Sequence, residues 1–156
     1  MLLLFFAFQL TLPAFSNGGA IPKENTCDGG GVSPALEWTG AAAAAKSFAI
    51  VLEDPDAPSG LFTHWLQWNI PASTTSLPAG FHGELGISGA NDFGNPGYGA
   101  PCPPKGHGPH RYFFRVYALK TASLTLKKNA NRAAFDLAIG GKVLGDAHYM
   151  GKYERK

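Results

Sequence analysis

The fold is decided by residues 47–58, which read Ser47-Phe-Ala-Ile-Val-Leu-Glu-Asp-Pro-Asp-Ala-Pro58. The part from Ser47 to Glu53 is apolar and partly β-branched, which is typical of a central strand. Two prolines then remove backbone donors and end the strand. Asp54 and Asp56 stand at this strand end, where a rigid turn is a good platform for a binding site. Because Asp and Pro are also ordinary turn residues, the segment alone predicts only a strand and a turn.

Further strands are expected on both sides of this segment. Residues 10–15 read as a short strand, and residues 62–70 as a strand rich in aromatic side chains. Residues 111–119 carry Tyr, Phe and Val, and residues 147–153 form the last expected strand. Alternation around the third of these strands places one set of side chains on a single face: His110, Tyr112, Phe114 and Val116.

A single helix is expected over residues 131–139. Asn131 is a suitable N-cap, and Gly140-Gly141 suits the C-terminal stop. The run Ala41 to Ala45 is low in complexity and reads as a loop or a helical turn. Several strands with one clear helix predict a mainly β fold, either a sandwich or a barrel.

The composition is that of one globular domain. The chain has 156 residues, of which 45% are hydrophobic and 15% are charged, so it can bury a core of its own. The net charge is +2 with Lys and Arg scattered along the chain, which argues against a nucleic-acid-binding surface. No apolar stretch reaches the roughly 20 residues that span a bilayer, so no transmembrane segment is expected.

Residues 1–9 form an apolar lead-in to the expected single domain of residues 10–156. The lead-in reads either as the remnant of a signal peptide or as the approach to a first strand. A basic n-region and a clear cleavage site, which a signal peptide would have, are missing. The compartment, cytoplasmic or periplasmic and secreted, is therefore left open.

Residues able to support chemistry gather in three places, of which the two aspartates are the first. His64 and His110 each lie near the start of an expected strand, where a lone His is more often a hydrogen-bonded core residue. The third place is a Gly/Pro-rich loop at residues 97–106, within the long stretch 83–108. Its glycines would let backbone N–H groups approach an anion closely. His107 is in the same flexible turn and is expected to be exposed and idle.

Taken together, these clusters could converge on one pocket. The carboxylates would raise the pKa of nearby His side chains, which could then carry protons and face an anion. The same residues could instead hold a metal ion, as two His and a carboxylate often do.

Several short segments stand in an order and spacing that are more specific than any one of them. They are Ile21-Pro22, Thr26-Cys-Asp-Gly29, Ser33-Pro-Ala-Leu-Glu-Trp38, Asp54-Pro-Asp-Ala-Pro58, His64 through Asn69, Asn91-Asp-Phe-Gly94, Tyr98 through Pro104, His110-Arg-Tyr112 and Gly151-Lys-Tyr-Glu-Arg155. From about residue 10 to the end, the chain resembles the phosphatidylethanolamine-binding protein family. It is most similar to the bacterial and archaeal branch, the Raf-kinase-inhibitor-like proteins.

The resemblance implies a β-sandwich of a large and a small antiparallel sheet with one or two short helices. It also implies a pocket for phosphate-like head groups, with no cofactor, no metal and no catalytic residue. The family loop usually carries Gly where Ala100 stands, so this methyl group could narrow the anion seat or need a different backbone angle. Carried over residue by residue, the ligand-binding set is Asp54, Asp56, Phe62, His64, Ala100, Pro103, His110 and Tyr112.

Roles follow for some of this set. Asp54 would orient a His by accepting one of its N–H groups, and Asp56 would support the turn. The resemblance further implies a cis peptide bond at Ala57-Pro58, although only about 5–6% of X–Pro bonds are cis.

Cys27 and Cys102 match no zinc or redox spacing. They lie in matched loop motifs and form either a disulfide or two free thiols.

The leading hypothesis is a protein that binds a small anion, such as phosphate or a phospholipid head group, and is not an enzyme. The alternative is a hydrolase or a metal-assisted enzyme that uses the same Asp/His pocket. Against this alternative, the sequence has no G-x-S-x-G and no H-E-x-x-H motif. A third hypothesis is an inhibitor that docks on a kinase or a protease, and a homodimer is also compatible with the sequence.

Overall fold

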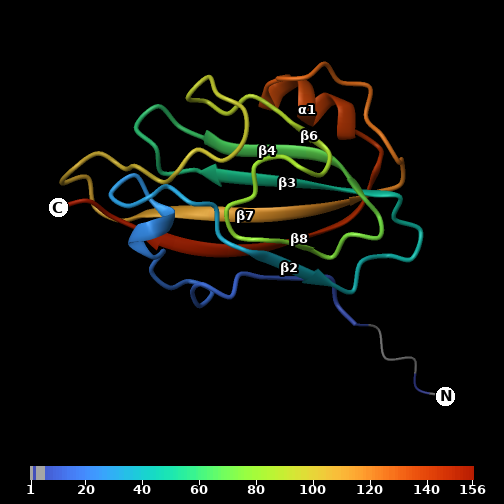
Figure 1. Ribbon diagram of the computed structural model, residues 1–156, viewed down its shortest axis with the longest axis horizontal. Coiled ribbons are helices and arrows are strands. Elements are labelled where there is room, and N and C mark those ends of the chain that lie inside the picture. The colour runs from blue at the N-terminus through green and yellow to red at the C-terminus, as the bar shows by residue number, and fades with distance from the viewer. Residues whose placement is uncertain (1, 3–5) are drawn as a thin grey trace.

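Two antiparallel sheets and one α-helix make up the fold of the computed structural model, which describes residue 2 and residues 6–156 (Figure 1). This confirms the expected mainly β sandwich. The expectation for the apolar lead-in falls partly on residues 1 and 3–5, which lie outside the described residues. Its reading as a signal remnant stays a prediction, as does the domain boundary at residue 10.

The larger sheet has five strands in the order β6-β4-β3-β7-β8, and all neighbours pair antiparallel. Because β3 lies at the centre and is covered on both faces, nearly all its residues are buried. This explains why its sequence is a continuous apolar run instead of an alternating one. The strands are β3 (Ser47–Asp54), β4 (Phe62–Pro71), β6 (Ile87–Ser88), β7 (His110–Leu119) and β8 (Val143–Tyr153).

The smaller sheet packs on one face of the larger sheet and encloses the main core. Its strands, in the order β1-β2-β5, are β1 (Gln9–Thr11), β2 (Leu36–Thr39) and β5 (Ser76–Leu77). The face of β7 predicted from alternation points into this core, since its four residues are all buried. Buried core members from the two sheets include Leu36, Trp38, Ile50, Leu52, Phe114 and Val116.

Helix α1 (Arg132–Ile139) covers the opposite face of the larger sheet. Phe135 and Ile139 pack there against a second buried cluster that includes Val51 and Trp68. The side chain of Asn131 accepts a hydrogen bond of 3.0 Å from the backbone N–H of Ala134, which is the N-cap that the sequence predicts.

Some element bounds differ from the sequence expectations. The first strand ends at Thr11 instead of residue 15, because Pro13 lacks a donor and the N–H of Phe15 turns back to the Leu12 carbonyl at 3.4 Å. The last strand begins at Val143, four residues earlier than expected. Four elements were not expected: β2, β5, β6 and the 3₁₀ turn η1 (Lys23–Asn25), each of four residues or fewer.

The outer edge of β8 is partly covered by the N-terminal segment 17–21. The N–H of Gly18 donates to the Met150 carbonyl at 2.7 Å, and the N–H of Ile21 donates to the Lys152 carbonyl at 2.9 Å. Segments from the two ends of the chain are therefore hydrogen-bonded neighbours. Within residue 2 and residues 6–156, no helix has the length and apolar character that a bilayer span needs.

The long Gly/Pro-rich stretch is held in place by contacts to the N-terminal part of the chain. The hydroxyl of Tyr98 donates to the Asn25 carbonyl at 2.7 Å, and the N–H of Cys27 donates to the Pro101 carbonyl at 3.1 Å. Cys27 and Cys102 form a disulfide with a Cα–Cα distance of 5.3 Å. The structure thereby settles the open alternative between a disulfide and two free thiols.

We expect loss of this disulfide to lower the free energy of unfolding by about 2–4 kcal/mol, because it closes a long loop in the unfolded chain. The two cysteines are 75 positions apart. The comparison is urea unfolding of oxidised wild type against Cys27→Ser and the double variant Cys27→Ser/Cys102→Ser. The single and double variants should be equally destabilised, and a double variant as stable as oxidised wild type would contradict the prediction.

Candidate functional site

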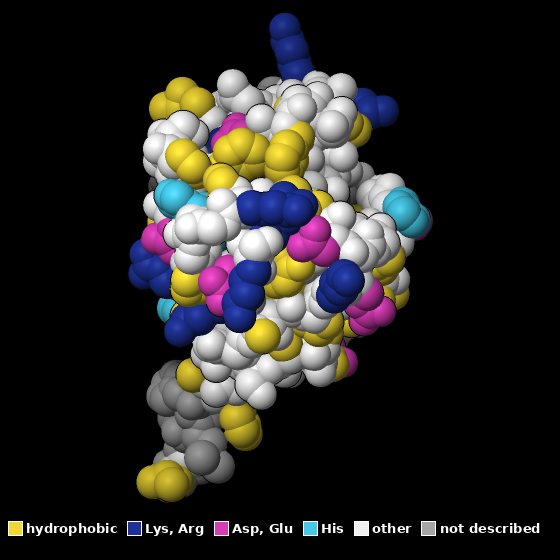
Figure 2. Space-filling model, turned by 90° about the vertical axis from the view of Figure 1, so that its left-hand side faces the viewer, with side chains coloured by type: hydrophobic (Ala, Val, Ile, Leu, Met, Phe, Trp, Pro, Cys, Tyr) yellow, Lys and Arg dark blue, Asp and Glu magenta, His cyan; other side chains and the backbone are white. Residues whose placement is uncertain are grey.

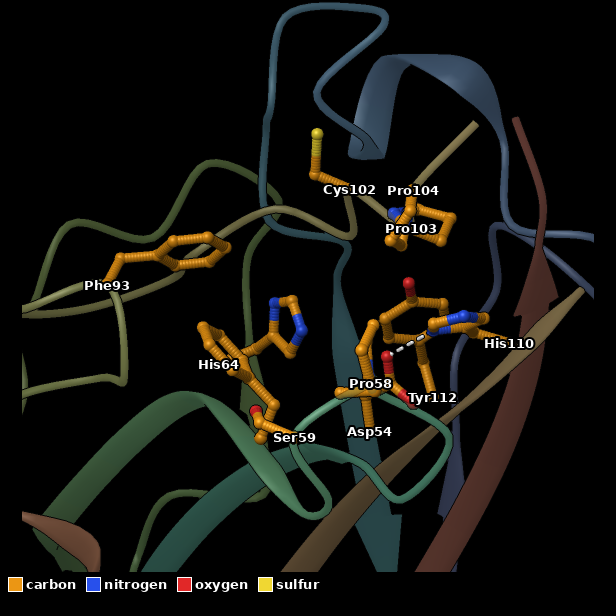
Figure 3. Close-up of a pocket in the computed structure, with 12 residues that line it drawn as sticks. Asp54, Pro58, Ser59, His64, Phe93, Cys102, Pro103, Pro104, His110 and Tyr112 are labelled. Atoms are coloured by element: carbon orange, nitrogen blue, oxygen red, sulfur yellow. Dashed lines mark hydrogen bonds and ion pairs between the residues drawn. The ribbon is translucent and has the colours of Figure 1, made fainter. Parts of the chain in front are cut away.

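A cavity of about 260 Å³ lies at one end of the larger sheet. The end of β3 and the starts of β4 and β7 meet there, beside the C-terminus (Figure 1). The loop at residues 97–104 closes the cavity from the other side, as Figure 3 shows. The lining residues are Asp54, Ala57, Pro58, Ser59, Phe62, His64, Phe93, Cys102, Pro103, Pro104, His110 and Tyr112.

The turn after β3 has a different backbone from the expected one. The described residues contain no cis peptide bond, so the expectation of a cis bond at Ala57-Pro58 is wrong. The N–H of Gly60 donates to the Ala57 carbonyl at 2.9 Å, which closes a β-turn with Pro58 at its second position. A trans proline fits that position, and Gly60, with φ of +102°, helps the chain to reverse.

Asp54 is buried and both of its carboxylate oxygens are engaged. One oxygen accepts the backbone N–H of Asp56 at 2.7 Å. The other accepts a hydrogen bond of 2.7 Å from Nδ1 of His110, which is also buried. A carboxylate can only accept, so Nδ1 of His110 carries a proton and its ring is oriented by Asp54. The dashed line in Figure 3 marks this pair.

His107 extends the pair to a third side chain. Its Nδ1 lies 2.6 Å from Nε2 of His110, a hydrogen-bond distance that places one proton between the two rings. His107 is exposed, as expected, but it is not idle. The contact was missed because it depends on how the turn between Gly106 and Gly108, both with positive φ, folds back onto β7.

His64 faces the cavity from β4. Its Nδ1 lies 2.8 Å from the carbonyl oxygen of Gly99, and a carbonyl can only accept, so this nitrogen carries a proton. The other ring nitrogen, Nε2, is directed into the cavity (Figure 3). Burial lowers the pKa of His64, although the Gly99 carbonyl and the Asp54 carboxylate act in the opposite direction. The neighbouring carboxylates thus act on the pKa of His64 in the expected direction, but desolvation outweighs them and the net shift is downward.

Tyr112 brings a polar group with no partner to the cavity. Its side chain is fully buried, and its hydroxyl has no hydrogen-bond partner among the described residues. In Figure 3 the hydroxyl points toward Pro103 at the lip of the cavity. Burial and the nearby Asp54 carboxylate raise the pKa of Tyr112, so the hydroxyl keeps its proton. A buried hydroxyl without a partner costs about 1–3 kcal/mol, and a ligand could satisfy it.

Aromatic rings form the cavity wall beside His64. The Phe62 and Phe93 rings meet edge to face at a centroid distance of 4.8 Å, and each lies about as close to the His64 ring, at 4.9 and 5.4 Å. The prolines at positions 58, 103 and 104 complete an apolar surface around the few polar atoms. Small-ligand sites commonly combine such walls with a few convergent polar groups.

Asp56, expected in the pocket, lies outside it. Its carboxylate accepts two hydrogen bonds of 2.9 Å from the Arg111 guanidinium and a third from the Arg111 backbone N–H. These bonds hold the pKa of Asp56 at about 2. Asp56 thus ties the turn to β7, which agrees with the supporting role expected for it, and it is not a lining residue.

Ala100 is also absent from the cavity lining. Its methyl group faces Gly31, since a Cβ added at Gly31 would lie 3.6 Å from it. Its φ is not positive, so the loop needs no glycine at this position. The expectation that the methyl group narrows the anion seat is therefore wrong. The structure brings together the other six residues of the expected set: Asp54, Phe62, His64, Pro103, His110 and Tyr112.

Other lining residues were not expected from the sequence. Phe93 belongs to a segment that carried the family resemblance, but no pattern assigned it to the pocket. Pro58 and Ser59 line the cavity because the turn after β3 folds over it. Among the described residues, no group of three or more His, Cys, Asp or Glu is placed to hold a metal ion.

The surface around the cavity end carries mixed charges (Figure 2). Arg111 pairs with Asp56 there, and Arg155 pairs with Asp28 at 3.1 Å. Lys and Arg side chains are thus interleaved with carboxylates, and the surface around the cavity is neither uniformly positive nor uniformly negative.

Comparisons with known proteins agree with this architecture. The family model described as phosphatidylethanolamine-binding protein matches residues 11–154. A UPF0098 protein of Aquifex aeolicus is 47% identical over 146 residues, which cover 91% of this chain and 85% of that relative. Two crystal structures, of a phosphatidylethanolamine-binding protein homologue from Chlamydia trachomatis and of YbcL from Escherichia coli, superpose with TM-scores of 0.89 each. They are 36% and 35% identical, and each alignment covers 96% of this chain and 99% of the other.

The Asp56–Arg111 pair gives a prediction for stability against pH. The pKa of Asp56 is depressed from 3.8 to about 2, so its contribution is complete above about pH 4 and is lost as the pH falls toward 2. Because the pair is partly exposed, Asp56→Asn should lower the melting temperature at pH 6 by less than about 4 °C. The difference from wild type should shrink between pH 4 and pH 2, measured by calorimetry. A difference that grows in this interval would contradict the assignment.

Proposed function

The chain belongs to the phosphatidylethanolamine-binding protein family, and from this premise we propose that it binds a small phosphate-like anion in the cavity at the end of β3. The ligand is free phosphate or the phosphate of a head group, held by His64 and Tyr112 in the cavity that His110 also lines. The observation that carries the proposal is the buried Tyr112 hydroxyl, which has no protein partner and borders the cavity.

The rest of the cavity supports a binding role. Asp54 fixes the ring of His110, and the Gly99 carbonyl fixes the ring of His64, so both histidines are held before a ligand arrives. Rings and loops that are already ordered lose little conformational entropy on binding. The apolar wall of Phe62, Phe93 and the prolines excludes water and strengthens the few polar contacts that a ligand makes.

We propose binding without turnover. An Asp–His pair is an arrangement that enzymes use for general-base catalysis. Here, however, Nε2 of His110 is directed at His107, and Cys102 is held in a disulfide. Ser59 lines the cavity, but no hydrogen bond joins it to His64 or His110 among the described residues. We therefore expect no activated nucleophile among the described residues that line the cavity.

We confine the proposal to a small ligand. The cavity supplies named polar groups for such a ligand, whereas the mixed charges of the surrounding surface favour no particular kinase or protease partner.

Tyr112→Phe tests the proposal with a minimal change. The variant removes only the unpaired hydroxyl, so we expect the free energy of unfolding to stay the same or to rise by up to about 1–3 kcal/mol. Phosphate affinity, measured by calorimetry at constant ionic strength, should fall about tenfold or more, because a hydrogen bond to a charged group is lost. The matched control is Tyr117→Phe, since Tyr117 lies on the helix side of β7. Unchanged phosphate affinity in Tyr112→Phe would refute the role of the hydroxyl.

The absence of turnover is tested with 4-nitrophenyl phosphate and 4-nitrophenyl acetate. We expect no release of nitrophenol above the buffer rate for wild type, since no nucleophile is hydrogen-bonded to either cavity histidine. Turnover that scales with protein concentration and disappears in His110→Ala would show that the protein is an enzyme.

A further inference from the structure

The charges of the cavity pose a problem for an anion. Of the twelve lining residues within the described part of the chain, none is Lys or Arg, and Asp54 is the single carboxylate. With neutral histidines, the cavity therefore has one negative charge and no positive one. A dianion would enter against this charge unless a proton entered with it.

The hydrogen bond of His64 to Gly99 indicates that this proton is needed between the other ring nitrogen, Nε2, and a ligand oxygen. Nδ1 of His64 donates to the Gly99 carbonyl, so in the neutral ring Nε2 is an unprotonated acceptor that faces the cavity. An anionic oxygen beside this nitrogen would place two lone pairs against each other. A single proton between the two atoms turns the repulsion into a charge-assisted hydrogen bond.

We infer that the cavity takes up an oxyanion together with one proton, which is held between Nε2 of His64 and a ligand oxygen. This inference rests on the proposed function. A dianion acquires the proton from solution, whereas a monoanionic oxyacid brings it as its own hydroxyl. The protonated oxyacid is thus the form that the cavity recognises, with Tyr112 donating to a second oxygen.

The groups around His64 are consistent with this assignment. Before binding, burial keeps the ring neutral at pH 7 by lowering its pKa. The charged and titratable groups that face the His64 ring are Asp54, Asp92 and Tyr112. The centroid of the Tyr112 ring lies 5.4 Å from that of the His64 ring. Both carboxylates favour a protonated ring, and the bond from Nδ1 to Gly99 persists in it, so the proton can be added without rearrangement.

The His107–His110 pair is a less suitable place for the proton. Nε2 of His110 is occupied by His107 and does not face a ligand oxygen. The charged groups around the pair are Asp54 on the inner side and Asp56, Arg111 and Lys152 on the outer side. Both ring nitrogens of His110 are already engaged, Nδ1 with Asp54 and Nε2 with His107, so neither can share a proton with a ligand.

The test is calorimetry of sulfate binding in HEPES and in Tris at pH 7.5. Sulfate stays a dianion throughout this range, so it cannot supply the proton, and the two buffers differ in ionisation enthalpy. We expect uptake of about one proton per sulfate and a Kd that rises about tenfold per pH unit above pH 7. His64→Gln should bind sulfate more weakly, with no uptake and with a Kd that is independent of pH. His107→Asn should keep the uptake.

Two results would overturn the inference and leave the proposed function standing. One is wild-type binding of sulfate without proton uptake. The other is uptake that persists in His64→Gln or disappears in His107→Asn, which would place the proton on the outer pair. If wild type binds neither sulfate nor phosphate, the inference and the proposed function fall together. If His64→Gln fails to fold, the inference is still tested by wild type in the two buffers, where absent uptake overturns it, and by His107→Asn, where lost uptake overturns it.

Discussion

A buried carboxylate at the end of the central strand is the constraint on which the rest of the site depends. Asp54 is 3% exposed, and a charge removed from water is tolerated only when its oxygens are well satisfied. The N–H of Asp56 and the ring of His110 provide this. Satisfying Asp54 thus fixes the turn after β3 and the first residue of β7 at the same time. Since β3 and β7 are neighbouring strands, the end of the sheet that lines the cavity is fixed by the same contacts.

The remaining parts of the site come from segments that have little regular structure of their own. The loop at residues 97–104 is held by backbone contacts to His64 and by the disulfide to the N-terminal part of the chain. The exposed turn with His107 is held mainly by its contact to His110 and by one backbone bond to Arg155. The side of the cavity formed by the sheet is therefore held by many contacts. The side formed by the loop 97–104 and the turn with His107 is attached at only a few points.

The sequence predicted the parts of the fold that depend on local pattern. The continuous apolar run of β3, the alternation in β7 and the cap at Asn131 each have a local cause, and the structure has all three. The position of Asp54, His64 and His110 at strand ends allowed them to meet in one pocket, and the family resemblance turned this into an expectation, because they lie in three separate strands. The role of His107 and the placement of Asp56 on Arg111 depend on how turns fold back onto the sheet, which no local pattern encodes. The cis bond was expected by analogy, and the β-turn that ends at Gly60 supplies the reversal instead.

The pairing of residues 17–21 with the edge of β8 has a consequence for how the domain folds. Asn17 and Met150, which are hydrogen-bonded in the folded chain, stand 133 positions apart in the sequence. Contacts of such high sequence separation form slowly, because the entropy of closing the loop opposes them until the contact is made. Until β8 has joined the sheet, the edge of β7 that it occupies is open to pairing with other chains. Folding of this domain is thus most exposed to misassembly before β8 pairs with β7.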